Sequence, residues 1–286
     1  MDQLPEDLTA GLDVTRVDSL SGGDTAAAYR LETSDGPVFA KTMLDAPAGV
    51  LELEAAGLEA LRAAAPSELS VPRVIRVTEH GLVLEWIDES YGAGGAATEA
   101  ECGSGLAQIH RAEAPHFGGL DPDLPQRIGS FPVDLSPTAD WADFLLHRRI
   151  EPLLRTAIDS RRLDPGAQDL LDELAPRAAE LAGPVEPPSL LHGDLWAGNR
   201  VVDSNGYNWL IDPSSFYGHR EYDLAMMLLF GGFGEDCFSA YDDVYPLGDG
   251  WRERVPWYQL PPLLVHAIRF GGGYGNSVMR ALKQLR

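Results

Sequence analysis

The sequence predicts an α+β fold of two lobes: a small antiparallel sheet with one helix over residues 1–88, and a larger, mainly helical lobe over residues 89–286. Two observations support this prediction. Short strands joined by glycine-containing turns dominate the beginning of the chain, with one amphipathic helix among them. Beyond them helical segments follow one another, interrupted by two buried strands that each end at an acidic loop.

The composition is that of an ordinary globular protein, with 44% hydrophobic and 23% charged residues. No apolar run approaches the ~18 residues that span a bilayer. The first residues, MDQLPEDLTA, are acidic, whereas a secretory signal would be basic and then apolar. Cys102 and Cys237 lie outside any C-x-x-C pattern, so we expect neither a disulfide framework nor a zinc site. A cytoplasmic protein is the resulting expectation.

The formal net charge is -22, from 44 acidic and 22 basic residues. Such a field repels nucleic acids and anionic membranes, so we expect neither as a partner. It favours cationic small molecules, although adaptation to solubility or to high salt explains the same excess. Only Lys41 and Lys283 are lysines, so Lys41 stands out in a chain that otherwise uses arginine.

Three strands, 14–20, 27–33 and 38–43, open the N-terminal lobe. The first two flank a turn that contains Gly22 and Gly23. Two glycines in a strand–turn–strand let backbone N–H groups approach a phosphate, or they form a plain hairpin turn. Both glycines are therefore candidate phosphate-binding residues.

An amphipathic helix, 48–65, follows the third strand and ends at Pro66. Its first half carries Glu52 and Glu54. Either carboxylate could pair with a cation on the third strand, or remain at the surface. We choose Glu54, because it shares the apolar face of the helix better than Glu52 does.

A second hairpin pairs strands 74–79 and 81–87 and runs into the glycine-rich segment 91–95, which is the best lobe boundary in the chain. Backbone groups at such a hinge could bind an adenine base. The candidate hinge residues are Glu85, Trp86 and Ile87.

The C-terminal lobe is predicted to be mainly helical. The expected helices are 98–112, capped by Thr98, then 139–158, 167–181, 221–230, 236–244, 255–270 and a short terminal helix. We interpret His110, in the first of them, as a core histidine with satisfied hydrogen bonds. Residues 113–139 are rich in Pro, Gly and Asp and form a long loop that could shape a substrate pocket.

The most informative stretch lies around two short strands, 189–191 and 207–211. The loop after the first, His192 to Asn199, reads H-G-D-L-W-A-G-N, which fits the kinase catalytic-loop pattern H-R-D-L-x-x-x-N with glycine in place of arginine. The loop after the second places Asp212 where kinases carry the Asp of D-F-G. Both loops together predict phosphoryl transfer.

Phosphoryl transfer needs positioning and charge neutralisation more than covalent chemistry. The loop pattern gives Asp194 the role of the catalytic base, which orients the attacking hydroxyl. It gives Asn199 and Asp212 the role of Mg²⁺ ligands. Lys41 lies on the third strand, where a kinase places the lysine that contacts the ATP phosphates, and we expect Glu54 to hold it there. A solvated strand lysine is the alternative for Lys41.

The chain resembles the fructosamine-3-kinase (ketosamine-3-kinase) family of the protein-kinase-like phosphotransferases. The similarity spans nearly the whole chain, and the run Asp194-Leu195-Trp196 and the segment 217–221 are its most specific parts. The other matching segments are 20–23, Lys41, 54–58, 84–86, 192–199, 211–213, 222–226, 229–233 and 270–274.

The resemblance implies a two-lobed protein-kinase-like fold and a kinase that uses MgATP. Its substrates would be ketosamines, as small molecules or bound to proteins, phosphorylated at the O3 hydroxyl, after which the product breaks down and frees the amine. Trp196 would pack on the sugar–amine portion, or be a buried structural residue. Asp24 stands where many eukaryotic relatives have a cysteine, and the segment 127–133 matches the family only in part.

Supporting roles follow for residues around the two loops. We expect His192 and Asp223 to support the catalytic loop, and His219 and Arg220 to order the loop after Asp212. His219 is also a candidate substrate contact. Alternative functions are another small-molecule kinase, for an aminoglycoside, choline or a sugar, or a catalytically silent ATP-binding scaffold. The identity of the ketosamine and the oligomeric state stay open.

Overall fold

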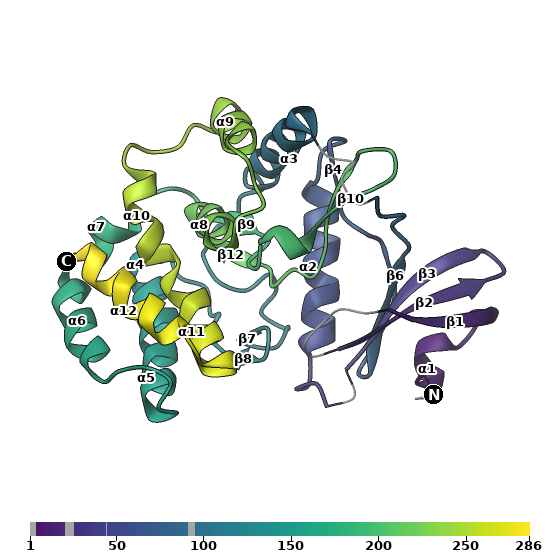
Figure 1. Ribbon diagram of the computed structural model, residues 1–286, viewed down its shortest axis with the longest axis horizontal. Helices are drawn as coiled ribbons and strands as arrows, with labels where there is room; N and C mark the ends of the chain where they lie inside the picture. The colour runs from purple at the N-terminus through teal and green to yellow at the C-terminus, as the bar shows by residue number, and fades with distance from the viewer. Residues whose placement is uncertain (1–3, 21–25, 44, 91–94) are drawn as a thin grey trace.

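The computed structural model describes residues 4–20, 26–43, 45–90 and 95–286, and it confirms the predicted α+β fold (Figure 1). The N-terminal lobe is built on a five-stranded antiparallel sheet in the order β1-β2-β3-β6-β5. Its strands are β1 (Val14–Leu20), β2 (Ala27–Thr33), β3 (Gly36–Thr42), β5 (Val74–Thr78) and β6 (Gly81–Glu85). All five lie within a few residues of the predicted strands.

The two faces of this sheet are covered by different helices. Short helix α1 (Glu6–Thr9) buries Leu8 against a face that includes Ala40 of β3. Helix α2 (Val50–Ala64) packs on the other face through its apolar positions. Because successive residues of a strand point to opposite faces, Lys41 lies on the face covered by α2. This alternation places the lysine beside Glu54.

A small second sheet joins the two lobes. Its order is β10-β11-β4, and it consists of β10 (Arg200–Val202), β11 (Asn208–Leu210) and β4 (Leu69–Ser70). The β4 strand pairs parallel with β11, so a segment from the N-terminal lobe hydrogen-bonds with the hairpin that follows the catalytic loop. The catalytic loop itself follows β9 (Ser189–Leu191), which pairs with β12 (Phe216–Gly218).

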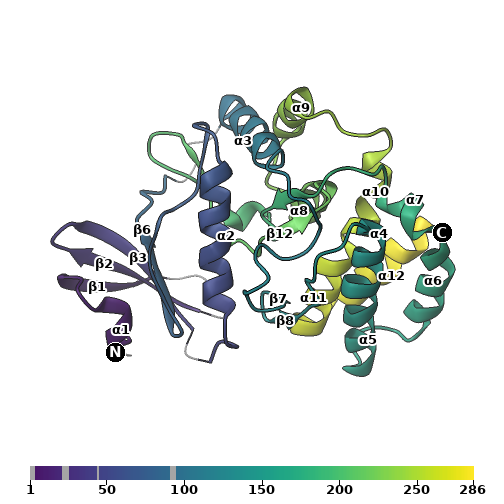
Figure 2. The same ribbon diagram turned by 180° about the vertical axis from the view of Figure 1, so that it is seen from behind.

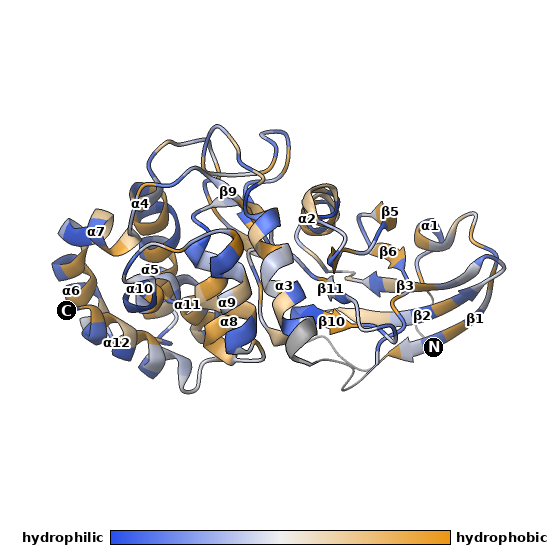
Figure 3. Ribbon diagram, turned by 90° about the horizontal axis from the view of Figure 1, so that it is seen from above, coloured by the Kyte–Doolittle hydropathy of each residue, from blue (hydrophilic) through white to orange (hydrophobic). Residues whose placement is uncertain are grey.

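Helix α3 (Ala96–Ile109) begins the C-terminal lobe and packs against α9 (Glu235–Val244). The predicted cap at Thr98 is wrong: Gly95 occupies the N-cap position and Thr98 lies inside the helix. In Figure 3 the N-terminal sheet and the C-terminal helices lie at opposite ends of the molecule, with α2 and α3 between them. Among the described residues, no helix combines the length and the apolar character that crossing a membrane requires.

The remaining helices of the C-terminal lobe extend from α8, which lies beside β12, to α6 and α12 at the far end of the molecule (Figure 2). They are α4 (Trp141–Asp143), the π-helix η1 (Phe144–Ile150), α5 (Glu151–Asp159), α6 (Gly166–Leu174), the 3₁₀-helix η2 (Ala175–Arg177), α7 (Ala178–Ala182), α8 (Glu221–Phe230), α10 (Trp251–Tyr258), α11 (Leu260–Phe270) and α12 (Tyr274–Leu285).

Three predicted helices are divided in the structure. The helix expected over 167–181 becomes α6, η2 and α7. The helix expected over 139–158 contains the π-helical turn η1 between α4 and α5. The helix expected over 255–270 is interrupted at Gln259, after which α11 begins. Two prolines lie in the first turn of α11, where N–H groups have no acceptor within the helix and their absence breaks no hydrogen bond. The long loop expected over 113–139 contains a hairpin of two short strands, β7 (Arg127–Ile128) and β8 (Phe131–Pro132).

Candidate functional site

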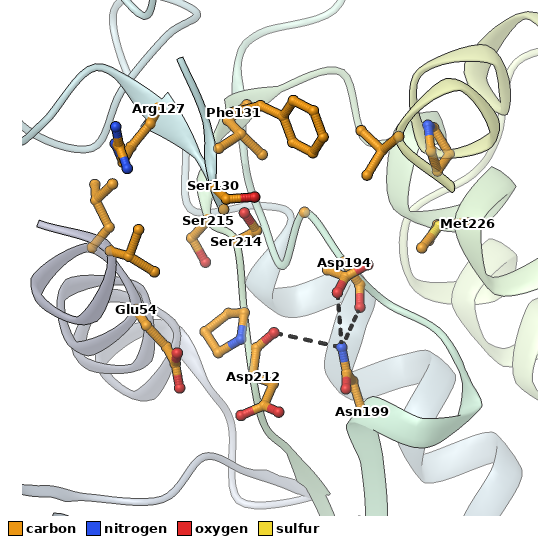
Figure 4. Close-up of a pocket in the computed structure, with 18 of the residues that line it drawn as sticks. Glu54, Arg127, Ser130, Phe131, Asp194, Asn199, Asp212, Ser214, Ser215 and Met226 are labelled. Carbon is orange, nitrogen blue, oxygen red and sulfur yellow. Dashed lines mark hydrogen bonds between the residues drawn. The ribbon is translucent and has the colours of Figure 1, made fainter. Parts of the chain in front are cut away.

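A pocket of about 370 Å³ lies between α2 and strand β3 on one side and the catalytic loop, α8, α11 and the β7–β8 hairpin on the other. Figure 4 shows several of its side chains converging from these elements. Most of the residues predicted for catalysis, metal binding and substrate binding line it. These are Lys41, Glu54, Asp194, Trp196, Asn199 and Asp212.

Lys41 forms a buried ion pair with Glu54. Its Nζ lies 2.6 and 2.7 Å from the two carboxylate oxygens of Glu54 and 3.1 Å from Oδ1 of Asp212. Burial by itself would lower the pKa of Lys41, but the charges of Glu54 and Asp212 outweigh burial and raise it. The ammonium is therefore charged at neutral pH and held at one edge of the pocket.

Asp194 stands at the centre of the site, on the loop after β9. Burial raises the pKa of Asp194 to about 6, against the lowering effect of a hydrogen bond from Asn199. The Asn199 amide nitrogen donates to the backbone oxygen of Asp194 at 2.8 Å, to its Oδ2 at 3.3 Å and to the backbone oxygen of Asp212 at 3.5 Å. These contacts join the two acidic loops, as the dashed lines in Figure 4 show.

The loop that carries Asp194 is anchored by fully buried side chains. The two carboxylate oxygens of Asp223 accept hydrogen bonds from the backbone N–H groups of His192, at 2.7 Å, and Gly193, at 2.9 Å. His192 Nε2 lies 3.0 Å from the backbone oxygen of Ile211, so it ties this loop to the strand before Asp212. His192 and Asp223 therefore make the supporting contacts that the sequence predicts.

His110 is also confirmed as a core histidine with two hydrogen-bonding partners. Its Nε2 lies 3.2 Å from Asp223 Oδ2, and its Nδ1 lies 2.7 Å from the hydroxyl of Tyr241. His110 thus helps to orient the Asp223 carboxylate from the side of α3.

The geometry explains why glycine replaces the arginine of the kinase pattern. Gly193 has a φ of 80°, in the left-handed region, and a Cβ at this position would lie 2.1 Å from the backbone oxygen of Ser214. That contact is far too short for any side chain. Asp212 also has a positive φ, 53°, which Asp tolerates better than most residues.

Asn199 and Asp212 offer oxygen atoms that suit a hard divalent cation. Because Asn199 makes its hydrogen bonds through Nδ2, its Oδ1 is free to act as a ligand, and Lys41 contacts only Oδ1 of Asp212. Mg²⁺ commonly takes one or two protein ligands and completes its shell with water and phosphate oxygens. Within the described ranges, no cluster of three or more His, Cys, Asp or Glu residues offers a metal cage, which fits a site completed by substrate.

Trp196 lies at the rim of the pocket. Its side chain is partly exposed, packs edge-on against Phe230 with ring centroids 6.0 Å apart, and covers the backbone of Gly198. A residue at Gly198 with a Cβ would place that atom 2.3 Å from the indole ring. The ring is thus held in place while one part of it stays open to the pocket.

His219 and Arg220 lie away from the pocket. His219 is buried among the rings of Trp141 and Tyr258, and its Nε2 lies 3.2 Å from the backbone oxygen of Pro184. Arg220 pairs with Glu186 at 2.6 Å instead of ordering the loop after Asp212. Both residues are therefore buried in the helical core and have packing roles. The sequence predicts instead that both order the loop after Asp212 and that His219 could also contact the substrate.

The expected nucleotide-binding elements are described only in part. Gly22 and Gly23 lie outside the described residues, as does Asp24. At the hinge, Glu85 accepts a hydrogen bond from the backbone nitrogen of Arg73 at 2.8 Å, and Arg30 stacks on the ring of Trp86 at 4.6 Å. The three hinge candidates, Glu85, Trp86 and Ile87, do not line the pocket described above.

The sequence interpretation missed the basic end of the pocket. Arg127, Arg149 and Arg269 all line it, together with Ser130 of the β7–β8 hairpin. The available signal was the basic run His147-Arg148-Arg149, which lies between the apolar residues 144–146 and Ile150. Arg149 lies in the π-helical turn, which periodicity alone does not predict.

Comparisons with known proteins match this chain over its whole length. The fructosamine kinase family model matches residues 1–286. A Lactiplantibacillus plantarum protein named probable ketoamine kinase is 35% identical over 277 residues, covering 95% of both chains. The chloroplastic protein-ribulosamine 3-kinase of Arabidopsis thaliana is 33% identical over 273 residues, which cover 93% of this chain and 81% of the plant protein.

The solved structure of a Thermobifida fusca protein assigned as a fructosamine-3-kinase superposes with a TM-score of 0.88. The two sequences are 36% identical, and the alignment covers 98% of this chain and 96% of the other. The arrangement of lobes described above is therefore shared with that protein.

Proposed function

The chain belongs to the fructosamine kinase family, and we propose that it is an ATP-dependent kinase that phosphorylates the O3 hydroxyl of ketosamines. One observation carries the proposal: the candidate base Asp194, the oxygen pair of Asn199 and Asp212, and the Lys41–Glu54 ion pair converge on a single pocket. Each group that phosphoryl transfer requires is present, which argues against a silent scaffold.

Asp194 is proposed as the catalytic base. Its raised pKa, about 6, leaves it mostly ionised at neutral pH while giving it more basicity than an exposed carboxylate has. The hydrogen bonds from Asn199 fix the position of this residue. An acceptor hydroxyl at Asp194 would be oriented for attack and would pass its proton to the carboxylate as the phosphoryl group moves.

Lys41 is proposed to steady the phosphates of ATP. Its longest contact, 3.1 Å to Asp212, is the one that a phosphate oxygen would replace, while the two bonds to Glu54 keep the ammonium in place. That exchange would also release Asp212 for the metal. Mg²⁺, held by Asn199 and Asp212, would neutralise the charge of the phosphates.

The adenine site stays a proposal based on chain position. The backbone of Glu85, Trp86 and Ile87 follows β6 at the junction of the lobes, where a base could be bound by backbone groups. Gly22 and Gly23 remain candidates for the phosphate-side turn. A cytoplasmic location is the matching expectation, because ATP is available there.

The test is an ADP-release assay with four acceptors: fructosyl-lysine, ribulosyl-lysine, an aminoglycoside and choline. Ketosamines should show a kcat/KM at least about tenfold above the other two, a difference of about 1.4 kcal/mol in transition-state binding. An equal or reversed preference would overturn the ketosamine assignment and leave the kinase assignment intact. ATP binding without turnover of any acceptor would instead support a silent scaffold.

A further inference from the structure

Arg149 is a buried cation inside the pocket that pairs with no carboxylate among the described residues. Its exposed fraction is 3%, and Nη2 donates to the hydroxyl of Tyr222 at 3.2 Å. The other two nitrogens, Nε and Nη1, are buried and have no hydrogen-bond partner in the described part of the chain. Leaving buried charged groups unpaired costs several kcal/mol, so such an arrangement is unusual in a protein interior.

Two other arginines of this lobe, the buried Arg220 and the half-buried Arg254, do have carboxylate partners. Arg220, with an exposed fraction of 2%, pairs with Glu186, and Arg254 pairs with Glu221. The chain thus follows the usual rule for burying a guanidinium elsewhere, even with its large excess of acidic residues. Arg149 differs from them in that it has no carboxylate partner among the described residues and lines the pocket.

Local structure fixes the Arg149 side chain in this position. The residue belongs to the π-helix η1, and π-helical turns within α-helices often occur at functional sites. Its guanidinium carbon lies 5.2 Å from the ring centroid of Phe216 and 5.7 Å from that of Tyr222. Cation–π contacts of this kind are weaker than a buried ion pair, so they orient the group without replacing a counter-charge.

Two further arginines, Arg127 and Arg269, line the same pocket. Nη1 of Arg127 is also buried without a partner among the described residues, and Arg269 donates to the hydroxyl of Ser130 at 3.0 Å. In Figure 4, Arg127 and Ser130 lie on the opposite side of Asp194 from Asp212 and Asn199. The pocket therefore has an acidic, metal-binding end and a basic end, with the candidate base between them.

Building on the proposed kinase function, we infer that this basic end binds an anionic group of the ketosamine acceptor, with Arg149 as its main ligand. A carboxylate next to the glycated amine, as in the ketosamine of a free amino acid, suits a guanidinium with free N–H groups. A phosphate on the sugar would present the same chemistry. Polycationic acceptors such as aminoglycosides are disfavoured at this end, although the overall charge of -22 alone favours cations.

The first experiment varies only the charge of the acceptor. It compares fructosyl-glycine, its uncharged analogue fructosyl-glycinamide, and fructosyl-glycinamide carrying a 6-phosphate, all by ADP release. At least one anionic acceptor should exceed fructosyl-glycinamide in kcat/KM by about tenfold or more, as expected for hydrogen bonds to a charged group. Preference for the carboxylate or for the phosphate identifies the source of the anion. Equal turnover of all three acceptors overturns the inference and leaves the kinase proposal standing.

The second experiment changes the protein. In Arg149→Met, the kcat/KM for the anionic acceptor should fall to within about twofold of the kcat/KM for fructosyl-glycinamide. Arg149→Lys keeps the charge and should retain part of the preference for the anionic acceptor. Arg155→Met, an exposed arginine on α5, is the matched control and should keep the full preference. An unchanged preference in Arg149→Met would contradict the inference. If Arg149→Met does not fold, Arg149→Lys must still show a reduced preference.

Calorimetry separates this inference from the proposed activity. Fructosyl-glycine should bind the wild-type protein at least about tenfold more tightly than fructosyl-glycinamide does, and Arg149→Lys should narrow that difference. This measurement needs no phosphoryl transfer. Failure of every ketosamine to be phosphorylated would overturn the proposed function, whereas equal affinities would overturn the anion-binding end of the pocket.

Discussion

Nζ of Lys41 lies within 2.7 Å of both carboxylate oxygens of Glu54, across the contact between strand β3 and helix α2. The contact joins residues that are 13 positions apart in the chain. Glu52, two positions earlier on the same helix, is the alternative that the sequence leaves open. Glu52 and Glu54 therefore allow a comparison between two carboxylates on the same helix, of which Glu54 forms the ion pair with Lys41.

Glu54→Gln should weaken MgATP binding by about tenfold or more, because the neutral amide no longer holds the Lys41 ammonium. Glu52→Gln is the control and should change the dissociation constant by less than about twofold, a difference of ~0.4 kcal/mol. Titration calorimetry measures both. Equal losses in the two variants would mean that the ion pair does not position Lys41 for the nucleotide.

Asp194→Asn should leave MgATP affinity near the wild-type value and reduce kcat by about two to four decades, the usual range for a lost general base. Asp212→Asn should weaken Mg²⁺-dependent ATP binding as well as turnover, because it removes a proposed metal ligand. Calorimetry with and without Mg²⁺, together with steady-state kinetics, separates the two effects. Loss of nucleotide binding in Asp194→Asn with retention in Asp212→Asn would reverse the assigned roles.

Oxidation should have little effect on activity. Cys102 and Cys237 are buried on helices α3 and α9, as predicted. The neighbouring Cys102 and burial raise the pKa of the Cys237 thiol, so little of the reactive thiolate is present there. The resemblance also places Asp24, which cannot be oxidised in this way, where many relatives have a cysteine.

We therefore expect activity after dithiothreitol and after mild peroxide to agree within about twofold, or ~0.4 kcal/mol. The control is the double variant Cys102→Ser, Cys237→Ser, assayed beside the wild type. A reversible, several-fold loss on oxidation that the double variant escapes would reveal a redox switch between α3 and α9.

The part of the stability that depends on His219 should fall as the pH is lowered from about 6.5 to 4. Burial lowers the pKa of His219 from 6.5 to about 4 in the folded protein, so the unfolded chain binds more protons over this interval. The stability linked to His219 is complete above the unfolded pKa and is lost as the pH falls toward the folded value, for a total of about 3 kcal/mol.

Urea unfolding at several pH values, in the wild type and in His219→Asn, measures this contribution. The variant should be less stable than the wild type at pH 7, and this difference in stability should shrink as the pH falls from 6.5 to 4. Burial also lowers the pKa of His192, so part of the slope should remain. Identical slopes in the two proteins would show that His219 does not titrate as described.

The local parts of the site could be predicted from sequence because the groups are close together in the chain. Asp194 and Asn199 are set by one short loop, and Asp212 follows the next strand. Glu54 was predictable because the apolar spacing of α2 decides which face meets the sheet. These contacts depend on periodicity and turn chemistry, which a sequence displays directly.

The rest of the site depends on tertiary packing. Arg149 lines the pocket from the π-helix η1, and a helical pattern gives no sign of that turn. His219 belongs to the conspicuous motif 217–221, yet its surroundings are aromatic core side chains. The two-residue strand β4 is also too short to predict, since its partner lies far along the chain.

The position of β4 has a consequence for how the two lobes hold together. Leu69 belongs to a continuous apolar cluster that includes Leu58 of α2, Leu106 of α3 and Leu195 of the catalytic loop. Separating the lobes at the hinge would break the β4–β11 pairing and expose this cluster on both fragments. We therefore expect the lobes to unfold cooperatively, and neither to persist as an independent fragment.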